Sequence, residues 1–121
     1  MAAAKAALDQ KRAENNPVAA IIVEPTNSTT GIAASHSFIH QLKSLARDYD
    51  AALIVDETNS GCGASGQGFW QYNGPADFVV FGKRTQVSGF FSKECPEHNF
   101  HLGDSELKLR QFAVIQDVIQ S

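Results

Sequence analysis

Two charged residues of opposite sign stand where predicted strands should end. Asp56 closes the run Ala51-Ala-Leu-Ile-Val-Asp56, and Lys83 follows the run Phe78-Val-Val-Phe81 after a single glycine. Continuous apolar runs rich in β-branched residues are typical of buried strands in a parallel sheet. Open α/β sheets bind their ligands at the carboxyl ends of such strands. The sequence therefore predicts that a carboxylate and an amine share a binding edge.

Such a pair suits more than one kind of chemistry. A strand-end acid can hold Mg²⁺ in an ATPase, but that site also needs a GxxxxGK[ST] loop, and Gly82-Lys83 lacks both the upstream glycine and the hydroxyl residue. Alternatively, Asp56 can face the ring nitrogen of pyridoxal phosphate while Lys83 forms the Schiff base and then moves protons. By spacing alone, charged residues that only solvate strand ends are the more frequent case.

The elements that would position this pair follow from the apolar pattern. Residues 2–14 are good helix formers that end before Pro17, and a buried strand is expected over 18–23. Ser35 or Ser37 is expected to cap the next helix. Its apolar face comprises Phe38, Ile39, Leu42, Leu45 and Ala46.

The second half of the chain is expected to add a third strand over 78–81 and a short strand or hairpin at 87–91. Asp104 or Ser105 is expected to cap a last helix. A strand–helix–strand unit of this length predicts parallel strands with a right-handed crossover. The sheet would keep open edges, which favours cover by a partner or by a larger chain.

Composition limits the class of protein. A chain of 121 residues has room for one domain, and 43% hydrophobic and 19% charged residues suit a globular fold. The net charge of −3 does not favour nucleic-acid binding, which usually requires a basic surface. No apolar run approaches the ~20 residues that a membrane-spanning helix requires. Cys62 and Cys95 are expected to be reduced thiols, and neither a secretory signal nor a transit peptide is apparent.

Five blocks in fixed order resemble class III pyridoxal-phosphate-dependent aminotransferases from about residue 18 to the C-terminus, most closely the eukaryotic enzymes that act on 4-aminobutyrate. The blocks are Ile21-Ile-Val-Glu24-Pro25, Leu53-Ile-Val-Asp56-Glu57-Thr-Asn-Ser-Gly61, Pro75-Ala-Asp77-Phe-Val-Val-Phe-Gly-Lys83, Gly89-Phe-Phe91 and Leu102-Gly-Asp104. The resemblance implies an α/β fold, part of the large domain of a fold-type I enzyme with three α/β/α layers and a mostly parallel sheet. We expect a single partial domain over 1–121, with a helical lead-in (1–17), a cofactor-site βαβ core (18–104) and a C-terminal helix (105–121).

The resemblance also implies roles for individual residues. Lys83 is similar to the Schiff-base lysine, Asp56 to the partner of the ring nitrogen, and Glu24 to the acid beside the substrate amine. Thr58 stands where the family has a valine on the cofactor ring. Asn59 replaces a glutamine that hydrogen-bonds the ring hydroxyl.

Other positions depart from the family pattern. Gly82 replaces the serine that commonly precedes the lysine. The family threonine that reaches a phosphate of the neighbouring subunit corresponds to Phe100, which cannot donate that hydrogen bond, or to a residue in a shifted register. The phosphate-binding Gly/Ser loop, the substrate arginine and the small C-terminal domain have no counterpart in these residues.

The implied function is transfer of the amino group of an ω-amino acid to a 2-oxo acid through lysine-bound pyridoxal 5'-phosphate. The implied assembly is a homodimer, and the implied location is the mitochondrial matrix, with the cytoplasm left open. The alternatives are another class III activity, such as ornithine or β-alanine transamination or a mutase, and an inactive truncated or degenerate fragment. No metal is expected, since His36 and His40 lack the acid of an HExxH motif.

Overall fold

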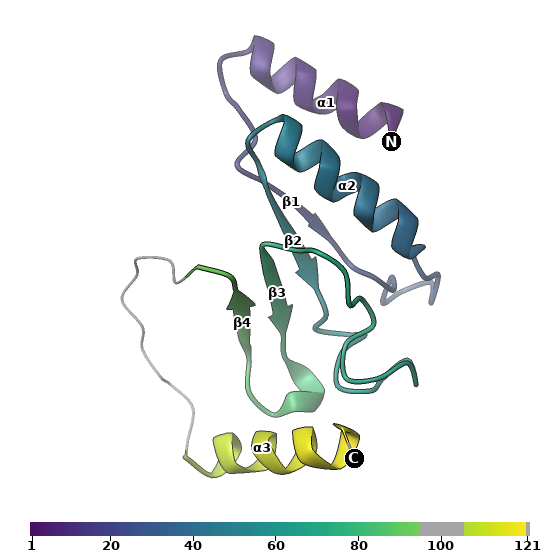
Figure 1. Cartoon of the computed structure of the whole chain (residues 1–121), viewed down its shortest axis with the longest axis vertical. Helices are drawn as coiled ribbons and strands as arrows, with labels where there is room; N and C mark the ends of the chain where they lie inside the picture. Colours follow the sequence, from purple (N-terminus) through teal and green to yellow (C-terminus); the bar gives the residue numbers. More distant parts are fainter. Residues whose placement is uncertain (95–105, 121) are drawn as a thin grey trace.

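The computed structural model describes residues 1–94 and 106–120 (Figure 1). Its elements in chain order are α1 (Ala2–Ala13), β1 (Ala20–Val23), α2 (His36–Asp48), β2 (Ala52–Asp56), β3 (Phe78–Phe81), the 3₁₀ turn η1 (Lys83–Thr85), β4 (Gly89–Ser92) and α3 (Glu106–Gln120).

The four strands form one sheet in the order β1-β2-β3-β4. β1 runs parallel to β2, and β2 runs parallel to β3, as expected for a βαβ core. β4 turns back antiparallel to β3, which confirms that the segment near Val87–Phe91 contributes a strand. The first strand begins at Ala20 rather than Val18, although Ala19 still accepts a hydrogen bond from the backbone of Ala52 at 2.9 Å.

Helix α2 covers one face of the sheet. Ser35 begins it by accepting a hydrogen bond from the backbone N–H of Phe38 at 3.1 Å, so Ser35 rather than Ser37 is the cap. The buried face of α2 packs on alternate strand residues, and together they form the main core. Its buried members are Ile39, Leu42, Ala46, Ala51, Leu53, Val55 and Tyr72.

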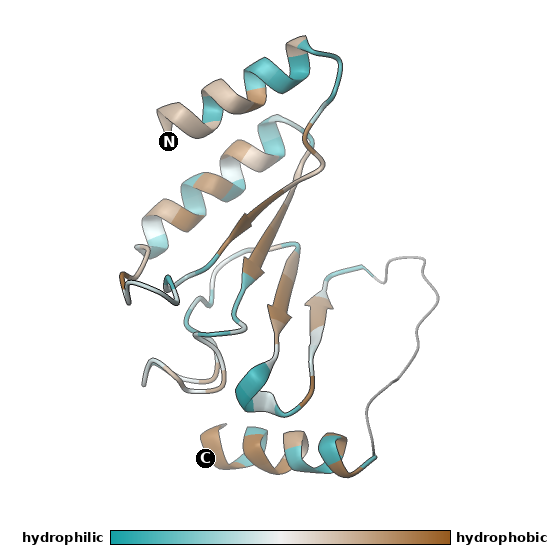
Figure 2. Cartoon of the chain, turned by 180° about the vertical axis from the view of Figure 1, so that it is seen from behind, coloured by the Kyte–Doolittle hydropathy of each residue, from teal (hydrophilic) through white to brown (hydrophobic). Residues whose placement is uncertain are grey.

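The opposite face of the sheet is less covered in the described part of the chain. Strand residues alternate between faces, so Ile22 and Ile54 point away from the Leu53–Val55 side. Ile22 is 66% exposed although it lies in the middle of β1. Figure 2 shows the strands as the most uniformly hydrophobic elements, in contrast to the mixed surfaces of the helices. The strands thus have the composition of a sheet covered on both faces, but the described residues bury only one face fully.

An aromatic cluster joins the second half of the chain. Trp70 packs against Phe81 and Phe91 with ring centroids 5.9 and 5.7 Å apart, and Phe112 of α3 stacks on Phe81 at 5.6 Å. Phe69 and Trp70 therefore hold the glycine-rich loop that precedes them, residues 61–68, against the domain. The predicted cap residues of α3, Asp104 and Ser105, lie outside the described residues.

Within residues 1–94 and 106–120, no helix has the length and apolar character required to span a bilayer.

Candidate active site

The carboxyl ends of β1, β2 and β3 meet at one edge of the sheet, because the three strands are parallel. The register pairs Val23 with Val55 and Asp56 with Val80. Glu24 therefore follows β1 at the level of Asp56, and Lys83 follows β3 three residues beyond Val80. The topology brings these three predicted site residues to the same edge.

Glu24 and Asp56 line one cleft of about 560 Å³ at the ends of β1 and β2. The other lining residues are largely apolar or uncharged: Ile22, Val23, Asn27, Thr30, Ile32, Ala34 and Phe38. Among the described residues, two carboxylates and no basic side chain therefore line this space. Such a lining suits a cationic group, for example an amine or a protonated ring nitrogen.

The two carboxylates are held by backbone donors of their own loops. Oδ1 of Asp56 accepts a hydrogen bond from the N–H of Thr58 at 2.9 Å, and Oε2 of Glu24 accepts one from the N–H of Ser28 at 3.2 Å. Among the residues that the structure describes, none donates a hydrogen bond to Oδ2 of Asp56. One oxygen of Asp56 thus orients the side chain, and the other is left for a ligand.

Lys83 lies on a tight turn directly after β3. Its backbone is left-handed, with φ of 54°, and Gln86 closes the turn by donating its N–H to the carbonyl of Lys83 at 3.0 Å. The Lys83 amine donates a hydrogen bond to Oδ1 of Asn59. Lys83 does not line the cleft of Glu24 and Asp56. The structure thus joins Glu24 with Asp56 and Lys83 with Asn59.

Thr58 and Gly82 lie side by side, which gives a reason for the glycine before the lysine. A Cβ added to Gly82 would lie 3.1 Å from Oγ of Ser88 and 3.4 Å from Cγ2 of Thr58. A serine at position 82 would therefore crowd Ser88. Thr58 is on the same loop as Asn59, and its methyl group lies beside Gly82, the residue that precedes Lys83.

Glu57 is a residue of the site region to which the sequence pattern assigned no role. It is only 1% exposed, and its carboxylate accepts hydrogen bonds from the Ser60 hydroxyl at 2.5 Å and from the Tyr72 N–H at 2.7 Å. These bonds tie the Asp56–Ser60 loop to the segment after the glycine-rich loop. Side chains alternate between the two faces along β2, so Glu57 lies on the buried face and Asp56 on the other. This alternation is the signal in the sequence that could have distinguished their roles.

The donor set fits pyridoxal phosphate in part. Lys83 supplies an amine for the aldehyde, Asp56 a free oxygen for the ring N–H, and Asn59 an amide for a polar ring substituent. The three side chains leave the phosphate unassigned, and Phe100, which the resemblance sets against a phosphate-contacting threonine, lies outside the described residues.

Other candidate groups have structural roles. Nε2 of His36 lies 3.2 Å from the carbonyl oxygen of Gln71, and the ring packs against Tyr72, whereas His40 lies exposed on α2. Cys62 is a free, buried thiol, and burial raises its pKa despite the lowering effect of Arg84. Cys95 lies outside the described residues.

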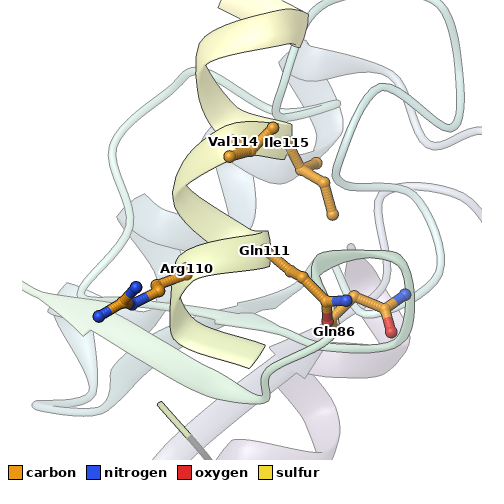
Figure 3. A pocket seen from close by; sticks show the side chains of 5 residues that line it. All are labelled: Gln86, Arg110, Gln111, Val114 and Ile115. Atoms are coloured by element: carbon orange, nitrogen blue, oxygen red, sulfur yellow. The ribbon is translucent and has the colours of Figure 1, made fainter. Parts of the chain in front are cut away.

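A second cavity of about 460 Å³ lies between α3 and the turn after Lys83 (Figure 3). Gln86, Arg110, Gln111, Val114 and Ile115 line it. Arg110, the charged residue in this described lining, forms an ion pair with Glu106 at 2.6 Å. The described residues that line this cavity include no carboxylate or amine that could act on a substrate.

Comparison with known proteins identifies similar chains. The family model described as aminotransferase class-III matches residues 1–99. The 4-aminobutyrate aminotransferase of Mycosarcoma maydis is 33% identical over 84% of this chain, which covers 22% of that protein. The human mitochondrial 4-aminobutyrate aminotransferase is 39% identical over 69% of this chain, which covers 18% of it.

Solved structures share the fold. Ornithine aminotransferase from Plasmodium yoelii superposes with a TM-score of 0.73 at 21% identity, over 96% of this chain and 34% of that one. A lysine aminotransferase from M. tuberculosis in the internal aldimine form gives a TM-score of 0.59 at 36% identity, over 75% of this chain and 23% of that one. The chain thus spans about a fifth of its curated relatives and corresponds to part of an aminotransferase fold.

Proposed function

We propose that this chain, which belongs to the class-III aminotransferases, contributes the cofactor-attaching lysine to a catalytic site. That site would transfer an amino group from an ω-amino acid to a 2-oxo acid. The proposed cofactor is pyridoxal 5'-phosphate. The observation that carries the proposal is the convergence of Glu24, Asp56 and Lys83 at the carboxyl edge of three parallel strands.

Each of these residues has a task that its chemistry suits. Pyridoxal phosphate, when bound, supplies an aldehyde that reacts with amines and a ring that accepts electrons. Lys83 would attach it and, once released, take the proton from the carbon beside the substrate nitrogen and return it to the aldehyde carbon. Asp56 would hold a proton on the ring nitrogen through its free Oδ2. Glu24 would orient the substrate amine, since both carboxylates face one cleft.

The amino donor we propose is most like 4-aminobutyrate, which the names of relatives 33–39% identical to this chain support. A second candidate is a basic diamino acid such as lysine or ornithine. The two carboxylates among the described residues of the cleft lining favour a donor with an additional positive charge. The name of a solved relative at 36% identity agrees with this alternative.

The complete site is proposed to need residues beyond these 121. The described site residues leave the cofactor phosphate unassigned, and relatives of this chain are about four times as long. We expect a homodimer for a protein of family length, testable by sedimentation equilibrium. We propose a location in the mitochondrial matrix, which cell fractionation tests; the names of the mouse and human relatives describe those two proteins as mitochondrial.

One experiment tests the cofactor site and the alternative of an inactive fragment. The purified chain is mixed with pyridoxal phosphate, and absorbance at about 410–430 nm is followed as the sign of covalent attachment to a lysine. We expect a band that Lys83→Ala abolishes and that Lys93→Ala, at an exposed lysine after β4, preserves. A band that does not depend on Lys83 contradicts the proposed role of this lysine in the chain.

A further inference from the structure

We propose that Asn59 is a positioning residue that holds the Lys83 amine in place before any cofactor arrives. This inference deepens the proposed function and rests on Lys83 as the attachment point. Asn59 would act on the lysine itself, in contrast to the ring-hydroxyl contact that the family resemblance assigns to this position. The observation that carries it is the hydrogen bond from the Lys83 amine to Oδ1 of Asn59.

The turn that carries Lys83 has a well-defined backbone. Thr85 is 1% exposed and donates its hydroxyl proton to the carbonyl of Val87 at 2.5 Å. Lys83 and Gln86 both have left-handed backbones, which non-glycine residues adopt only when their surroundings require it. The direction in which the Lys83 side chain leaves the sheet is therefore set by the fold.

The loop that carries Asn59 is equally restrained. Asp56 accepts the N–H of Thr58, and Gly61 donates its N–H to the carbonyl of Glu57 at 2.8 Å. A Cβ on Gly61 would lie 2.8 Å from that same carbonyl oxygen, so the loop is closed tightly against itself. The buried carboxylate of Glu57 also restrains this loop, because it accepts hydrogen bonds from Ser60 and Tyr72. Two restrained loops therefore present the amide of Asn59 to the amine of Lys83.

The contact restricts the Lys83 side chain before any cofactor binds. A lysine side chain has four rotatable bonds, and fixing it costs conformational entropy. An acceptor on the neighbouring loop removes part of that freedom in advance and keeps the amine bonded at a fixed position. The amide oxygen accepts a hydrogen bond from either the charged or the neutral amine.

The test measures the reactivity of Lys83 without cofactor. The 121-residue chain is labelled with a trace of an amine-acetylating reagent, and peptide mass spectrometry compares Lys83 with exposed Lys93 in the same molecule. We expect Asn59→Leu to raise the Lys83/Lys93 labelling ratio about two- to tenfold, which is the range expected for one lost hydrogen bond. Asn59→Asp, which keeps an acceptor, should leave the ratio at or below that of the unmodified chain.

Two further variants serve as controls. Asn16→Leu changes an exposed asparagine in the α1–β1 connection and should leave the ratio unchanged. Asn59→Ser replaces the amide by a shorter polar side chain. It decides the outcome if circular dichroism shows that Asn59→Leu is unfolded. An unchanged ratio in the folded Asn59→Leu or Asn59→Ser variant overturns the proposal, as does an equal rise in Asn59→Asp.

The result is separable from the proposed function. If the chain forms no Lys83-dependent band with pyridoxal phosphate but Asn59→Leu still raises the labelling ratio, the positioning contact stands and the cofactor role fails. If the Lys83-dependent absorbance band forms at the same rate in the unmodified chain and in Asn59→Leu, and the Lys83/Lys93 labelling ratio is also the same in both, the cofactor role stands and the positioning role of Asn59 fails.

Discussion

Asp56 and Glu57 are adjacent carboxylates with opposite environments. Asp56 closes β2 and faces the cleft with Glu24, whereas Glu57 points into the protein and accepts bonds from Ser60 and Tyr72. Burying a carboxylate is costly unless donors compensate it, and Glu57 has two. One residue of the pair is thus available to a ligand, and the other organises the loop that presents Asn59.

Replacing Glu57 should destabilise the protein, because its two donors would lose their acceptor in a buried site. We expect Glu57→Ala to lower the free energy of unfolding by about 2–4 kcal/mol. Glu57→Gln should cost less, since its amide oxygen can still accept one of the bonds. Urea denaturation measures both values. Asp48→Ala, at an exposed acid of α2, is the control and should change stability by less than about 0.5 kcal/mol; an equally small effect of Glu57→Ala would contradict the assigned role.

At the scale of elements, α2, β2 and β3 are tied together at the sheet edge opposite the site. The Lys43 amine of α2 forms an ion pair with Asp77 just before β3, and Asp77 also accepts the N–H of Leu53 in β2 at 2.7 Å. Burial raises the pKa of Asp77, but the hydrogen bonds from Lys43 and Leu53 outweigh it and hold the pKa below its usual value. This contact fixes the starts of the two strands whose ends carry Asp56 and Lys83.

Stability should therefore fall in acid partly through Asp77. Because the pKa of Asp77 is lower in the folded than in the unfolded chain, its contribution is present above the unfolded pKa of about 3.9 and is lost as the pH falls through the folded value. We expect the stability difference between the native chain and Asp77→Asn to shrink as the pH falls below about 4. Denaturant unfolding between about pH 3 and 7 at constant ionic strength measures this difference. For the control variant Asp48→Asn, at an exposed position, the stability difference from the native chain should change little with pH. A stability difference for Asp77→Asn that is the same at every pH contradicts the prediction.

At the scale of the whole molecule, two packed regions share one sheet. The core under α2 holds β1 and β2, and the aromatic cluster of Phe69, Trp70, Phe81, Phe91 and Phe112 holds β3, β4 and α3. Helix α3 contacts the domain through Phe112, which stacks on Phe81, and through Ile119 beside Gly63, while Val114 on the same helix is 62% exposed. The helix thus depends on a narrow line of contacts.

Phe112→Ala should release α3 without unfolding the α2 core. We expect amide hydrogen exchange across residues 106–120 to rise at least tenfold, because the ring that stacks on Phe81 is lost. Exchange in β1, β2 and α2 should change little. Val114→Ala removes an exposed side chain from the same helix and should leave exchange in α3 near its original rate. Equal acceleration in α2 and α3 would show that the two regions unfold as one unit.

The apolar pattern alone predicted the parallel βαβ core, the strand at 78–81 and the amphipathic α2, because buried strands and helices need these periods wherever they pack. Ordered motifs around Asp56 and Lys83 indicated the aminotransferase family. Local pattern could not choose between Ser35 and Ser37 as the cap, since both are serines near the start of the same apolar stripe. That choice depends on which hydroxyl reaches the N–H of Phe38.

Tertiary structure alone decided the contacts that shape the site. Asn59 and Lys83 are 24 residues apart, as are Leu53 and Asp77. Their meeting depends on the register of β2 against β3 and on the left-handed turn after β3. A sequence states which side chains could hold a cofactor ring, because residue chemistry is local. Which of them share a cleft and which bond to one another is decided by strand register and loop closure, which bring distant residues together.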